Sequence, residues 1–139
     1  MEDYNLREAQ LYRVLVGVFG KERVIPRAKI TLVCGGILPD LPEARYPKYA
    51  SWAEGFRCLF TIVNGQDEPC LVIEFFSGFG GVIDPVEAER EHYLPSVLRC
   101  RNIYYMTLSE EEFDELIAPE ASMSFLELME FKIGDEVLS

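Results

Sequence analysis

The stretch "FRCLFTIVNGQDEPCLVIEFF", Phe56 to Phe76, predicts a β-hairpin at the centre of a sheet. Residues 56–63 are apolar and favour a strand, and Asn64-Gly65 is a strong hairpin signal. Residues 70–76 are apolar on both faces, which indicates a strand that is covered on both sides. Side chains alternate along a strand, so Glu74 should share a face with Val72 and lie opposite Ile73.

Glu74 is the one acid inside this returning strand, and its presence needs an explanation. Either the strand lies at an edge and Glu74 faces water, or the carboxylate belongs to a functional site. If Glu74 is buried and unpaired, desolvation should raise its pKa. Arg90, Arg99 and Tyr93 are candidate partners that would offset this rise.

The segment before the hairpin predicts a helix and a strand. Asn5 and Glu8 have the spacing of a capping box, and Gly20 is expected to end the helix. Glu8 is either a cap that favours the helix dipole or a residue at the border of the buried face. Residues 24–34 predict a strand, and residues 35–51 predict a long loop that acts as a lid or an irregular cover.

The segment after the hairpin predicts a helix, a strand and a second helix. Asp84 should cap the first helix with Glu87 closing its capping box, and Pro95 should kink or end it. Residues 102–109 predict a strand, and Ser109 should cap the second helix with Glu112 three positions later.

The composition is that of a soluble globular chain of 139 residues, the length of one domain. No segment approaches the ~20 consecutive apolar residues that a membrane span needs. The acidic, polar start "MEDYNLREAQ" lacks the pattern of a secretory signal, so we expect a cytoplasmic protein that does not contact a membrane. Its net charge of −11 makes nucleic acid an unlikely partner, because phosphate binding requires a basic surface.

The residues that usually bind metals or form disulfides are few and scattered. Cys34, Cys58, Cys70 and Cys100 form no C-x-x-C pair, and His92 is the single histidine. A zinc site would therefore need an unusual set of ligands. We interpret the cysteines as small apolar residues that stay reduced.

The predicted order of elements, with the stretches "LREAQLYRVL", "CLFTIVNGQDEPCLVIEFF" and "EREHYLPSVLRCRNIYYMTL", resembles the PD-(D/E)XK nuclease superfamily. The likeness is greatest to its small branch related to very-short-patch-repair endonucleases. It implies an α/β (α+β) fold with a restriction-endonuclease-like αβββαβ core, in which helices flank a mixed central sheet. It also implies one domain over residues 1–117, followed by an amphipathic extension, residues 118–139, packed on the domain or on a partner.

The resemblance also implies where a metal site would lie. In the family a helix Glu, an Asp on the first hairpin strand, and Glu-x-Lys on the second hold Mg²⁺ and activate water. Glu8 and Glu74 match the two glutamates. Leu59 stands where the Asp is expected, or Thr61 if the register slips, and Phe76 stands in place of the lysine. The matched site therefore lacks two of its expected groups.

Three functional hypotheses follow. The first is a catalytically inactive, nuclease-like domain that serves as an interaction or regulatory protein with no cofactor. The second is a divergent nuclease that binds Mg²⁺ through Glu8, Glu74 and a relocated acid such as Glu87. The third is a homo-oligomeric assembly subunit, in which the apolar tail of residues 123–133 pairs two copies or binds another protein.

Overall fold

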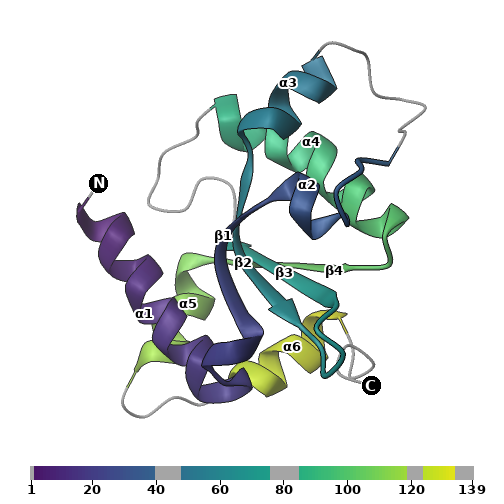
Figure 1. Ribbon diagram of the computed structural model, residues 1–139. Helices are drawn as coiled ribbons and strands as arrows, with labels where there is room; N and C mark the ends of the chain where they lie inside the picture. Colours follow the sequence, from purple (N-terminus) through teal and green to yellow (C-terminus); the bar gives the residue numbers. More distant parts are fainter. Residues whose placement is uncertain (1, 40–47, 76–84, 119–123, 134–139) are drawn as a thin grey trace.

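The computed structural model describes residues 2–39, 48–75, 85–118 and 124–133. They form an α+β fold in which helices cover both faces of a four-stranded mixed sheet (Figure 1). The helices are α1 (Glu2–Phe19), η1 (Lys21–Arg23), α2 (Ile30–Val33), α3 (Lys48–Gly55), α4 (Pro85–Cys100), α5 (Glu110–Ile117) and α6 (Phe125–Ile133). The strands are β1 (Val24–Lys29), β2 (Arg57–Val63), β3 (Pro69–Phe75) and β4 (Tyr104–Leu108). The predicted αβββαβ order and the mixed sheet are confirmed.

The sheet has the order β1-β2-β3-β4, so the predicted hairpin supplies its two central strands. β1 and β2 are antiparallel, β2 and β3 are antiparallel, and β3 and β4 are parallel. The Asn64 side chain accepts hydrogen bonds from the backbone N–H groups of Gln66 and Glu68, which holds the hairpin turn. Because β3 has a neighbour on each side, the interpretation of Glu74 as a residue of an edge strand is wrong.

Two apolar clusters cover the two faces of the sheet. α1, α5 and α6 pack on one face, where Leu71, Ile73 and Phe75 contribute from β3. α2, α3 and α4 pack on the other face, to which Val72 belongs. The alternation predicted from the sequence is therefore confirmed, and it places Glu74 on the α4 side.

Three details of the helices and strands differ from the sequence-based expectation. α1 begins at Glu2 rather than after Asn5, since acids in a first turn already favour a helix N-terminus. The strand predicted over residues 24–34 ends at Lys29, because Ile30 and Val33 are buried as one turn of α2. The loop predicted over residues 35–51 includes the start of α3, and residues 40–47 lie outside the described residues.

α4 continues past Pro95 to Cys100, so the proline does not end the helix. A proline inside a helix costs roughly 3 kcal/mol because it removes one backbone hydrogen bond. Buried side chains on both sides of Pro95 offset that cost: Leu94 precedes it, and Val97 and Leu98 follow it. The predicted capping box at Ser109 and Glu112 is present at the start of α5, as expected.

Candidate functional site

The candidate site lies where α1, the three antiparallel strands and α4 meet around two carboxylates, Glu8 and Glu74. Glu74 is only 4% exposed, although it is an acid in the middle of the sheet. Its Oε2 accepts a hydrogen bond of 2.5 Å from the backbone N–H of Leu59 on β2. Its Oε1 accepts a hydrogen bond of 3.3 Å from the guanidinium of Arg90 on α4, which is also buried. Each oxygen of the Glu74 carboxylate therefore accepts a hydrogen bond from the protein.

Glu8 is bound by a different arginine. The Nε of Arg27 donates to Glu8 Oε1 and its second guanidinium nitrogen donates to Glu8 Oε2, each at 2.8 Å. Such a two-pronged contact is the preferred geometry between arginine and a carboxylate. Glu8 therefore pairs with an arginine of β1, and because α1 begins at Glu2 it lies beyond the first turn and does not cap the helix.

The backbone at Arg27 is unusual and helps to place this side chain. Arg27 has a φ of 55°, in the left-handed region that non-glycine residues seldom adopt. The pairing of β1 with β2 is interrupted at the same place, between the partners Pro26–Phe60 and Ala28–Cys58. Arg57 donates to the Arg27 carbonyl oxygen at 3.0 Å, which fixes the irregular segment.

Burial dominates the electrostatics of Glu74. It raises the pKa of Glu74 from its ordinary value of 4.5 to about 7, against the lowering effects of the Leu59 hydrogen bond and the charges of Arg90 and Arg27. The positive charge of Arg27 thus acts on Glu74 as well as on Glu8. Burial also raises the pKa of the neighbouring Cys58 thiol, and Glu74 raises it further.

This pKa shift predicts that the folded protein loses stability as the pH rises from about 5 to about 8. In that window folded Glu74 keeps a proton that the unfolded chain has released, so the folded state binds more protons. The free energy of unfolding should fall by on the order of 3 kcal/mol across it. Urea unfolding at a series of pH values measures how the free energy of unfolding depends on pH. This dependence should be weaker in the Glu74→Gln variant. An equal slope in both proteins would contradict the assignment to Glu74.

Among the described residues, the two positions at which the resemblance places the Asp carry no carboxylate. Leu59, at the position expected for the Asp, is an apolar side chain that packs into the cluster formed with α1. Thr61 is buried and carries no charge. Among the residues whose placement is described, no group of three or more His, Cys, Asp or Glu side chains has the arrangement of a metal site.

Three further residues that the sequence singled out lie at or beyond the limit of the described residues. Glu87 belongs to the first turn of α4, but its side chain lies outside the described residues. Phe76 and Asp84 lie wholly outside them. Of the three partners considered for Glu74, Arg90 is the one that binds it. The role of Arg27 was not anticipated, since its only sequence signal is that it follows Pro26 in a predicted strand.

No protein-family model matches the chain, and neither a curated protein nor a solved structure shows significant similarity to it. Within the described ranges, no helix has the length and apolar content needed to cross a bilayer.

Proposed function

We propose that this chain is a catalytically inactive domain with a nuclease-like αβββαβ core, which acts by binding another protein. The observation that carries the proposal is the pairing of each carboxylate with an arginine: Glu8 with Arg27 and Glu74 with Arg90. In the family that the sequence resembles, the matching carboxylates hold a cation. Here guanidinium groups neutralise them, and the site needs no metal to balance its charge.

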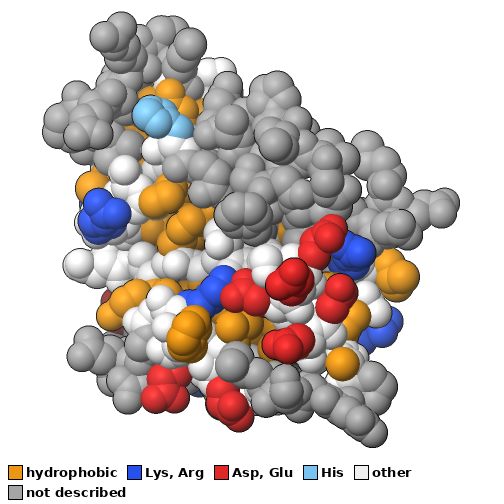
Figure 2. Space-filling model, turned by 180° about the vertical axis from the view of Figure 1, so that it is seen from behind, with side chains coloured by type: hydrophobic (Ala, Val, Ile, Leu, Met, Phe, Trp, Pro, Cys, Tyr) orange, Lys and Arg blue, Asp and Glu red, His pale blue; other side chains and the backbone are white. Residues whose placement is uncertain are grey.

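The geometry of the two ion pairs supports the proposal that the site does not perform metal-dependent hydrolysis. A metal activates water only when protein oxygens hold it with positions left open for water and substrate. The hydrogen bonds of Glu74 to Leu59 and Arg90 occupy both of its oxygens, and Arg27 occupies both oxygens of Glu8. The net charge of −11 also works against the approach of a polyphosphate chain. Figure 2 shows acidic side chains gathered among apolar ones on one face of the molecule.

We expect no cleavage when the pure protein is incubated with single- and double-stranded DNA and RNA in the presence of Mg²⁺ or Mn²⁺. Gel electrophoresis of end-labelled substrates measures this, and calorimetry with the same ions should show no uptake at millimolar concentration. Cleavage that requires the metal and disappears in the Glu74→Gln variant would overturn the proposal. It would support instead the divergent nuclease that uses Glu8, Glu74 and Glu87.

Self-association is a second candidate function, and exposed apolar side chains on α6 favour it. Phe125, Leu128 and Met129 of this helix are buried, whereas Phe131 is 82% exposed and Leu126 is 45% exposed. α6 thus packs on the domain through one side and presents large apolar groups on another. Large apolar side chains that are exposed in a monomer can become buried in a protein interface.

One chain has a mass of 15.9 kDa. If two copies pair through α6, light scattering after size-exclusion chromatography should give a mass near twice that value. The Phe131→Asp variant should then return the mass to that of a monomer, because a charge would be placed in an apolar contact. Leu32, 68% exposed on α2, provides the matched control through Leu32→Asp. A monomeric mass for the unmodified protein at every concentration would reject self-association and leave a different protein as the partner.

A further inference from the structure

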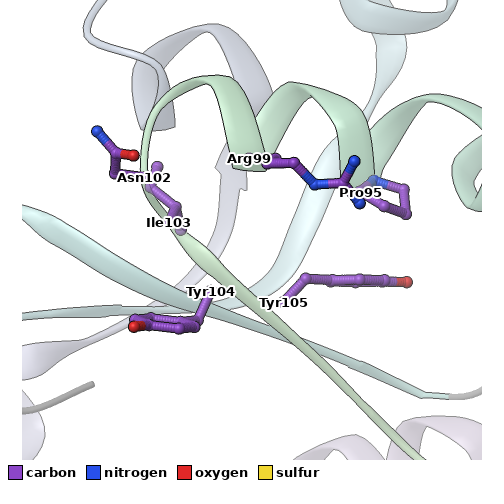
Figure 3. A pocket seen from close by; sticks show the side chains of 6 residues that line it. All are labelled: Pro95, Arg99, Asn102, Ile103, Tyr104 and Tyr105. Carbon is purple, nitrogen blue, oxygen red and sulfur yellow. The ribbon is translucent and has the colours of Figure 1, made fainter. Parts of the chain in front are cut away.

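A cavity of about 460 Å³ lies between the end of α4 and the start of β4, away from the Glu8 and Glu74 carboxylates (Figure 3). It is lined by Pro95, Arg99, Asn102, Ile103, Tyr104 and Tyr105. Its volume is within the range of sites that hold small molecules. The proposed function does not use this cavity.

The local fold builds the cavity from two walls. Pro95 and Arg99 are four residues apart on α4, so they lie on one side of the helix. After the helix, Asn102 adopts a left-handed φ of 56°, and the Ile103 N–H donates to the Leu98 carbonyl oxygen at 2.9 Å. This tight ending turns the chain back, and β4 then runs beneath the last turns of α4. Both walls belong to regular structure, so the cavity is preformed.

The wall formed by α4 carries the positive charge of Arg99, which no described residue neutralises. Within the described part of the chain, no carboxylate or carbonyl oxygen binds the guanidinium of Arg99. Other arginines there do have such partners: Arg7, Arg27 and Arg90 bind carboxylates, and Arg23, Arg57 and Arg101 bind backbone carbonyls. Arg13, exposed on α1, likewise has no such oxygen partner among the described residues, but it does not line this cavity.

The lower wall carries two aromatic rings. Tyr105 is half-buried against the cluster on the α4 side of the sheet, while Tyr104 is 36% exposed. In Figure 3 the side chains of Arg99 and Tyr105 extend in the same direction from opposite walls. A guanidinium above a phenol ring offers a charge and a flat apolar surface to the same ligand. The Asn102 amide adds a donor and an acceptor at one end.

We propose that this cavity binds a small anionic aromatic molecule, with its carboxylate or phosphate group on Arg99 and its ring against Tyr105. Arginine is suited to both anions, because its planar donors match their oxygens. The Tyr105 ring supplies the flat contact that aromatic ligands favour, whereas the Tyr104 side chain extends in the opposite direction (Figure 3). The inference is independent of the proposed function, because the ligand would not contact the Glu8 and Glu74 carboxylates.

Titration of the isotope-labelled protein with four probes tests the proposal by two-dimensional NMR. Benzoate and phenyl phosphate carry a ring and an anion, benzyl alcohol carries only the ring, and inorganic phosphate only the anion. We expect saturable shifts of the amides of residues 99–105 with benzoate or phenyl phosphate, at an affinity roughly tenfold above that of either single-feature probe. Comparing the first two probes tells a carboxylate ligand from a phosphate ligand.

The Arg99→Gln variant should weaken binding of the better probe by roughly tenfold or more, since it removes the charged donor. Arg13→Gln is the matched control and should bind as the unmodified protein does. Three outcomes would overturn the proposal: no shift of these amides at millimolar probe, equal binding of benzyl alcohol and the anionic rings, or unchanged binding in Arg99→Gln.

Discussion

The Arg90→Leu variant should be less stable than the unmodified protein by about 3–5 kcal/mol at about pH 9. Arg90 and Glu74 are each about 5% exposed at the side chain, so water does not replace the lost guanidinium. At this pH the carboxylate is ionised, and the variant leaves a buried charge without its cation. Urea unfolding followed by circular dichroism measures the difference in the free energy of unfolding.

Two comparisons isolate the ion pair in this experiment. At about pH 5 Glu74 is protonated in the folded state, so Arg90→Leu should cost clearly less than it does at about pH 9. The double variant Glu74→Leu/Arg90→Leu should regain most of the stability, because apolar residues can replace a buried pair at little or no cost. An equal loss at both pH values, with no recovery in the double variant, would show that Arg90 acts through packing alone.

The Phe125→Ala variant should lose about 3–5 kcal/mol of stability, as large aromatic residues do when they are truncated in a core. Phe125 is 2% exposed and packs edge-on against Phe19, with 5.8 Å between the ring centroids. This contact joins the C-terminal helix α6 to the end of α1. Its loss should therefore lower the midpoint of urea unfolding for the whole domain.

Phe131 is a matched control on the same helix, with the same side chain in a different environment. Because it is 82% exposed, Phe131→Ala should change stability by no more than ~0.5 kcal/mol. If the two alanine variants were equally stable, α6 would not be part of the cooperative unit. If Phe131→Ala were the more damaging one, Phe131 would be buried in solution by a second chain.

Local signals in the sequence were sufficient for most of the fold. Asn64-Gly65 predicts the hairpin, and the alternation of Leu71, Val72 and Ile73 predicts that β3 is covered on both faces. Ser109 and Glu112 predict the start of α5. These signals work because turn geometry, strand alternation and helix caps depend on residues only a few positions apart.

Local signals failed where burial outweighs intrinsic preference. Pro95 is a signal for the end of a helix, but α4 continues through it to Cys100, where the apolar residues on either side of the proline are buried. Ile30 and Val33 fit a strand pattern as well as a helical turn, and the cluster beneath α2 selects the turn. In both cases the deciding contacts come from other elements.

The sequence alone determined that Glu74 shares a face of a central strand with Val72 and that the apolar Leu59 stands where the resemblance predicts a second acid. The tertiary structure decided what neutralises the acids: Arg27 reaches Glu8 across 19 positions and Arg90 reaches Glu74 across 16. The chain contains many Lys and Arg residues, and no short-range pattern in the sequence indicates which of them pairs with Glu8 or with Glu74. An ion pair forms between the groups that folding buries together, and that is a property of the packed helices and sheet.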